Sequence, residues 1–187
     1  MGGIEIYALS VIFVLGIVGL IRGPAKELGV TMALVVLLAV LAQFDALVGL
    51  DELPARLNDM LDGFGLGSDN EVKQRMAAWA VYFLVIIATT FMAYHGQDTL
   101  KFDIKDPPGI TKSIAGWLAG ALNGYLIFGT LWYYLRELDY PMQQYSWFIT
   151  QFTDLAEDMV RFLPQNVASP LIISALALGL LWWRILK

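Results

Sequence analysis

The stretch that decides the fold runs from Ile4 to Phe44 and reads IEIYALSVIFVLGIVGLIRGPAKELGVTMALVVLLAVLAQF. Residues 4–21 are apolar apart from Glu5 and Ser10, and residues 28–44 are more apolar still. A helix over residues 4–21 is about 27 Å long, which is enough to cross the hydrocarbon core of a bilayer. A short polar turn separates the two runs, so the sequence predicts a tight pair of membrane-spanning helices.

The composition of the whole chain agrees with burial in lipid. Of 187 residues, 58% are apolar and 16% are charged, and the mean hydropathy is +0.62. This is too hydrophobic for a water-soluble domain. The net charge of −5, with no basic cluster between aromatic residues, argues against a nucleic-acid partner. The absence of cysteine excludes disulfides, thiolate metal sites and cysteine nucleophiles.

Two further apolar runs predict the third and fourth spans at about residues 76–95 and 113–135. A last run inside residues 166–187 is short for a span, and snorkelling of Arg184 and Lys187 extends it. The expected fold is therefore an all-α membrane helix bundle with four or five transmembrane helices. Residues 1–165 form the membrane domain, and the C-terminal hydrophobic helix is an addition to it.

Two amphipathic helices are expected outside the spans, at about residues 52–62 and 143–163, because apolar side chains recur there at helical spacing. Asp51 is the expected cap of the first. Ser68 and Glu71 form a capping-box pattern before the third span.

The distribution of basic residues predicts the orientation. On a five-span map, seven Lys and Arg residues fall on one side of the membrane and five on the other. The positive-inside rule then places the C-terminus in the cytoplasm, and it places the N-terminus and both amphipathic helices outside.

Glycines and one amide are the candidate packing residues of the spans. The fourth span repeats glycine every four residues, which lets another backbone approach closely. The glycines of the first span offer a mate within the chain, although a second copy of the chain could also fill this role. The side-chain amide of Asn123 is expected to form a hydrogen bond across a helix interface. The packing residues are Gly16, Gly19, Gly23, Gly116, Gly120, Gly124 and Asn123.

The turn after the first span contains Arg22, Pro24, Lys26 and Glu27. Pro24 suits an early position of the second helix, and Glu27 favours its positive end. The turn is interpreted either as an anchor that fixes topology by its positive charge or as a cytoplasmic contact site or gate.

His95 is the sole histidine and ends the third span. It could ligate a haem or a chlorophyll-type pigment, or it could be an unliganded polar tip at the interface. No cofactor and no metal site is expected, because no second ligand accompanies His95 and no acidic loop has the geometry of a cation site.

The order of these parts resembles the colicin V production protein (CvpA) family of bacterial inner-membrane proteins. The resemblance lies in the turn Arg22-Gly23-Pro24-Ala25-Lys26-Glu27, in the glycine-rich run from Ala115 to Gly124, and in an aromatic segment ending Phe162-Leu163-Pro164. Pro24 stands where the family usually has an aromatic residue, and Asn123 stands where an arginine is common. The resemblance implies bacteriocin export or envelope maintenance, in the cytoplasmic membrane of a bacterium.

The expected function is therefore non-enzymatic and depends on helix packing and on binding of lipid, of a second copy or of other membrane proteins. No base and nucleophile can be paired from these residues. Two alternatives stay open, namely an accessory structural subunit of a bioenergetic or photosynthetic complex and a small transporter or channel.

Overall fold

A computed structural model describes residues 3–96, 106–143, 145 and 154–186. Every regular element in these ranges is an α-helix, so the all-α prediction is confirmed. The helices are α1 Gly3–Arg22, α2 Pro24–Val48, α3 Leu53–Asp62, α4 Glu71–His95, α5 Ile110–Glu137, α6 Asp154–Arg161, α7 Pro164–Val167 and α8 Pro170–Ile185.

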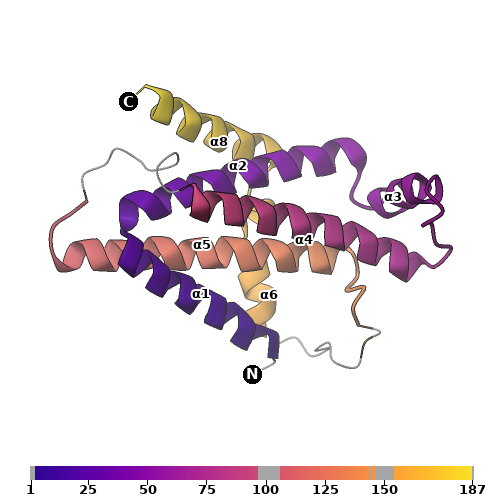
Figure 1. Ribbon diagram of the computed structural model, residues 1–187, viewed down its shortest axis with the longest axis horizontal. Helices are drawn as coiled ribbons and strands as arrows, with labels where there is room; N and C mark the ends of the chain where they lie inside the picture. Colours follow the sequence, from indigo (N-terminus) through magenta and orange to yellow (C-terminus); the bar gives the residue numbers. More distant parts are fainter. Residues whose placement is uncertain (1–2, 97–105, 144, 146–153, 187) are drawn as a thin grey trace.

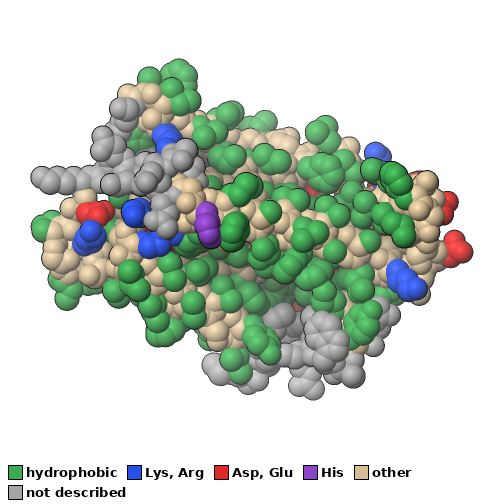
Figure 2. All heavy atoms as spheres, viewed as in Figure 1, with side chains coloured by type: hydrophobic (Ala, Val, Ile, Leu, Met, Phe, Trp, Pro, Cys, Tyr) green, Lys and Arg blue, Asp and Glu red, His purple; other side chains and the backbone are tan. Residues whose placement is uncertain are grey.

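Four of these helices, α1, α2, α4 and α5, are long and apolar enough to cross a membrane. This confirms a membrane helix bundle with four candidate spans. Figure 1 shows them lying roughly lengthwise beside one another, with α3 at one end of the bundle. Figure 2 shows hydrophobic side chains over the visible face, whereas charged side chains gather towards its two ends. Such a surface suits a bilayer, whose apolar layer is bounded by two polar ones.

Helix α2 lies at the centre of the bundle and packs against α4, α5 and α8. Its side chains Val30, Leu34 and Leu38 are almost fully buried, together with Ile86 of α4 and Leu126 of α5. A helix that is apolar all round is one that neighbours cover on several sides. This explains why the second hydrophobic run has no polar face.

The last apolar run forms α8, which has 16 residues and is shorter than the four candidate spans. It runs antiparallel to α2. At its start, Ser174 Oγ accepts a 2.9 Å hydrogen bond from Gln43 Nε2. Near its end, Leu180 and Trp183 lie around the same small cavity as Leu28 of α2. The C-terminal helix thus accompanies α2 along most of its length (Figure 1).

Two helix starts differ from the predicted caps. The N-cap of α4 is Asn70, whose Oδ1 accepts hydrogen bonds from Val72 N at 2.9 Å and Lys73 N at 3.3 Å. Ser68 caps nothing directly, because its Oγ accepts from Asn70 N. Helix α3 begins after Glu52 and not after Asp51, with Pro54 in its first turn. Proline supplies a preset φ there, so no side-chain cap is needed.

The first amphipathic helix is α3, close to the predicted 52–62. For the second, Gln143 and Tyr145 lie in turns closed by hydrogen bonds to Tyr140 O and Met142 O. Its described part is α6, and the predicted residues 144 and 146–153 lie outside the described ranges.

Candidate functional site at the break between the first two helices

The break between α1 and α2 is built on Gly23. This residue has φ +86° and ψ 160°, a conformation that favours glycine. Its N–H donates to Gly19 O at 2.9 Å and so ends α1. Pro24 then opens α2 at a position where no backbone donor is required. The chain reverses within a single residue.

Because α2 begins at Pro24, Glu27 lies in its first turn and is completely buried. One carboxylate oxygen, Oε1, is 3.4 Å from Arg22 Nε, and 14% of the Arg22 side chain is exposed. The guanidinium carbon of Arg22 also lies 4.6 Å from the centre of the Tyr94 ring. This cation–π contact and the positive end of the α2 dipole add to the ion pair.

The second carboxylate oxygen of Glu27, Oε2, accepts hydrogen bonds from two other helices. The Tyr94 hydroxyl of α4 donates at 3.2 Å, and Asn123 Nδ2 of α5 donates at 2.9 Å. The same Asn123 nitrogen lies 3.1 Å from the backbone oxygen of Glu27. Thr31, one turn along α2, donates from its hydroxyl to Asn123 Oδ1 at 2.7 Å. We call Arg22, Glu27, Thr31, Tyr94 and Asn123 the polar cluster.

The start of α5 is also tied to the break. Asp106 Oδ2 is 2.8 Å from Lys112 Nζ, and Asp106 Oδ1 accepts from the backbone N–H of Ala25 at 3.4 Å. This satisfies one of the donors that the first turn of a helix leaves open. Lys26, the next residue along α2, is half-buried.

The candidate glycines lie along the contact between α1 and α5. A Cβ added at Gly19 would overlap the carbonyl oxygen of Gly116 and would lie 2.9 Å from Gly120 Cα. A Cβ added at Gly120 would overlap the carbonyl oxygen of Leu15. The two backbones therefore touch along a line where no side chain fits. We call this contact the glycine seam.

The glycine seam continues beyond these residues. A Cβ at Gly124 would lie 2.8 Å from Ile12 Cα, and one at Gly16 would lie 2.7 Å from Trp117 Nε1. Rising positions on α1 meet falling positions on α5, so the two helices are antiparallel. The glycines of α1 and those of α5 therefore pack against each other within one chain.

His95 lies at the end of α4 but outside the polar cluster. Its ring stacks on Phe91 with centroids 3.9 Å apart, and its Nδ1 lies 3.2 Å from the Phe91 carbonyl oxygen. No group of three His, Cys, Asp or Glu residues that could hold a metal occurs in the described part of the chain.

A second acidic side chain lies towards the other end of α2. It is Asp45, which is half-buried near the end of the helix. Tyr82 of α4 and Tyr134 of α5 donate hydrogen bonds to its two oxygens at 2.5 and 2.7 Å. The two tyrosine rings stack with centroids 3.8 Å apart.

Tyr94, Thr31 and the burial of Glu27 are not among the features that the sequence predicts. A signal was present for Thr31, since it follows Glu27 by four residues and shares its helix face. No comparable signal marks Tyr94. It lies among aromatic residues near a span end, and the preference of aromatic rings for the membrane interface accounts for it equally well.

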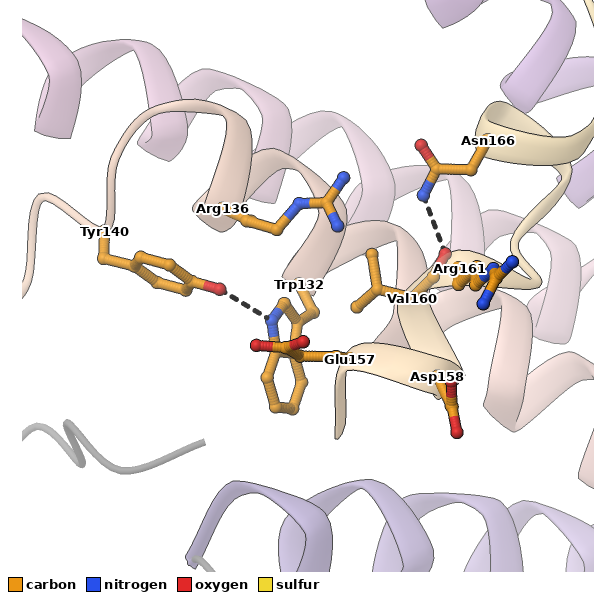
Figure 3. A pocket seen from close by; sticks show the side chains of 8 residues that line it. All are labelled: Trp132, Arg136, Tyr140, Glu157, Asp158, Val160, Arg161 and Asn166. Atoms are coloured by element: carbon orange, nitrogen blue, oxygen red, sulfur yellow. Dashed lines mark hydrogen bonds between the residues drawn. The ribbon is translucent and has the colours of Figure 1, made fainter. Parts of the chain in front are cut away.

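A separate cavity of about 640 Å³ lies where α6 meets the end of α5. Figure 3 shows Arg136 and Arg161 approaching it from different helices, with the Trp132 indole nitrogen donating to the Tyr140 hydroxyl. Burial raises the pKa of the Tyr140 hydroxyl above its ordinary value.

What the polar cluster can do follows from its bonding. The Arg22 guanidinium balances the charge of the Glu27 carboxylate, and two neutral donors reach its Oε2, whereas Oε1 has the ion pair but no hydrogen bond. The cluster joins α1, α2, α4 and α5 at a single point, and it contains no base paired with a nucleophile. Searches of protein-family models, of curated proteins and of solved structures find no match for this chain.

Proposed function

We propose that this chain is a non-enzymatic CvpA-like protein of the bacterial inner membrane, which acts in bacteriocin export or envelope maintenance by helix packing and partner binding. One observation carries the proposal. Two stretches of the resemblance, the turn from Arg22 to Glu27 and the glycine-rich run of α5, meet in space through Glu27 and Asn123.

The spatial meeting of these stretches supports the proposal for a physical reason. Residues 96 positions apart join through a buried carboxylate and a buried amide. Such a contact fixes one register of α5 against α2, because any other register leaves a polar group unpaired in an apolar bundle. A rigid end of the bundle results. It presents Lys26 and Lys112 to a partner, on the side that the positive-inside rule assigns to the cytoplasm.

Complementation tests the proposal. The chain is expressed in a bacterium that lacks its own CvpA-family protein, and growth under a membrane-disrupting detergent and bacteriocin secretion are measured. We expect the wild-type chain to restore one or both. Lys26→Glu should reduce the restoration, because it reverses the charge of the presented face without touching the polar cluster.

The matched control is Lys73→Glu, which makes the same charge change on α4 at the opposite end of the bundle. It should complement as well as the wild type. Failure of the wild-type chain to restore either property, at normal abundance in the membrane, would contradict the proposal.

A small transporter or channel is the second candidate, and the two acidic side chains within α2 favour it. Intramembrane carboxylates often mark ion or substrate paths. Between Glu27 and Asp45, however, the interior is packed by Leu34, Leu38 and Ile86. Flux of ions or small solutes in reconstituted vesicles would favour this candidate over the first.

A further inference from the structure

The surroundings of Asp45 differ from those of Glu27. Glu27 has Arg22 at 3.4 Å, whereas no salt bridge joins Asp45 to a Lys or Arg among the described residues. Its hydrogen-bond donors, Tyr82 and Tyr134, are neutral hydroxyls. A half-buried carboxylate with neutral donors alone is electrostatically incomplete.

Asp45 lines a small cavity of about 130 Å³ between α2, α5 and the segment that leads into α8. Each of its oxygens accepts one tyrosine hydrogen bond and retains a further lone pair. The cavity wall includes Ala42, Ala168 and Ile173, which are apolar. A ligand in the cavity can therefore bind the remaining lone pairs of the Asp45 carboxylate, in surroundings of low polarity.

Gln165 also lines this cavity. Gln165 Nε2 donates to Thr130 Oγ1 at 3.1 Å. The Thr130 hydroxyl gives its own proton to Leu126 O at 2.6 Å, so it can only accept from Gln165. This fixes the amide orientation. Gln165 Oε1 is then a buried acceptor that receives no hydrogen bond within the described residues.

We propose that this cavity binds a small monovalent cation, with the Asp45 carboxylate and Gln165 Oε1 among its ligands. Hard cations prefer carboxylate and carbonyl oxygens, and both are present. One carboxylate balances one positive charge, whereas a divalent ion would keep an uncompensated charge beside apolar walls. The cavity has room for the ion and a few waters, each of which takes about 30 Å³.

The site goes beyond the proposed function, which needs no ligand. It would couple cation binding to the packing of α8, because Gln165 lies just before that helix and Asp45 lies on its neighbour α2. A bound ion would hold the two together, in addition to the hydrogen bond between Gln43 and Ser174.

Thermal unfolding of the purified full-length protein in detergent tests the proposal, with Na⁺ as the probe and intrinsic fluorescence as the signal. NaCl is compared with N-methyl-D-glucamine chloride at equal ionic strength. We expect NaCl to raise the Tm with increasing concentration, since a ligand that binds only the folded state stabilises it. Asp45→Asn and Gln165→Leu should each abolish this rise.

Asp51→Asn is the matched control, because Asp51 is an exposed carboxylate just past the end of α2. It should keep the full response to Na⁺. If Asp45→Asn does not fold, Gln165→Leu decides, since it removes only the amide. Equal melting of the wild type in the two salts would overturn the proposal. So would a Na⁺ response that survives Gln165→Leu, or stabilisation that follows pH and not the cation.

Discussion

Glu27 is the residue on which the interior of this bundle depends. Its carboxylate is fully buried, yet each oxygen has a partner, Arg22 on one side and Tyr94 with Asn123 on the other. A buried ion pair contributes little net stability compared with apolar packing, but removal of one partner is costly because a charge is left behind. The polar cluster therefore acts mainly by specifying how the helices are arranged, and it adds little to the free energy of unfolding.

Removal of Arg22 alone should be more harmful than removal of the pair. Arg22→Met leaves Glu27 uncompensated and should cost about 3 kcal/mol of unfolding free energy. Arg22→Met combined with Glu27→Met should recover a large part of that loss. Unfolding in mixed detergent micelles measures both. A double variant that is less stable than Arg22→Met would contradict this interpretation of the cluster.

Truncation of Asn123 tests the amide itself. Asn123→Ala removes two donors to Glu27 and should destabilise the protein by about 1 to 2 kcal/mol. Leu122→Ala is the control, because Leu122 is its neighbour on α5 and is 46% exposed. The same unfolding assay should show the smaller effect for Leu122→Ala, and the reverse order would argue against a role for the amide.

The glycine seam decides how two helices meet. Helices that approach until backbone touches backbone gain van der Waals contacts in the absence of a hydrophobic driving force in lipid. Helix α1 makes its main contact with α5 in this way and contacts its chain neighbour α2 far less. The seam therefore acts as the attachment of α1 to the bundle.

A single methyl group should disrupt this contact. Gly120→Ala places a Cβ on the Leu15 carbonyl oxygen and should lower the Tm, despite the gain of up to about 1 kcal/mol in helix propensity. Gly179→Ala on α8 is the control, since nothing lies within 4 Å of its added Cβ. Gly179→Ala should leave the Tm unchanged or raise it. Equal Tm values for the two variants would contradict the seam.

The cap at the start of α4 can be tested locally, because the packing of the spans is not affected. Asn70→Ala should cost about 1 kcal/mol and speed hydrogen exchange at the amides of Val72 and Lys73, which the Asn70 side chain accepts from. Ser68→Ala should leave exchange at these two amides nearly unchanged. If Ser68→Ala has the larger effect, the capping box seen in the sequence is the true cap.

The helices could be predicted from the sequence because their apolar runs are long and uninterrupted. The polar cluster could not, since Glu27 follows the charged and turn-forming residues Arg22, Gly23, Pro24 and Lys26, and nothing near it in the sequence indicates that its carboxylate is buried. Its burial depends on Tyr94 and Asn123, which lie 67 and 96 positions further along the chain. The cap at Asn70 was missed for a smaller reason, because Ser68 and Glu71 have the same spacing as a capping box.

The contacts of α8 place both of its ends beside α2, at Gln43 and at Leu28. The end of α8 lies near Leu28, so the C-terminus should be on the same side of the membrane as the turn at Gly23. This favours five crossings over four. It also agrees with the proposed orientation, in which that side is cytoplasmic.

The absence of native cysteine makes this topology directly measurable. Single variants Lys26→Cys, Leu186→Cys and Asp59→Cys are treated with a membrane-impermeant maleimide in intact cells and again after lysis. We expect Asp59→Cys on α3 to react in intact cells, and the other two to react only after lysis. Reaction of Leu186→Cys together with Asp59→Cys would mean that α8 does not cross.

The long separation between Glu27 and its partners has a consequence for biosynthesis. Tyr94 and Asn123 follow Glu27 by 67 and 96 positions, so when α2 enters the membrane Arg22 is the partner of the Glu27 side chain that enters with it. The helical hairpin must wait, with this carboxylate at the bilayer edge, until α5 emerges and α1 can dock along it. Nascent chains that stop before α5 should for this reason be prominent targets for membrane quality-control proteases.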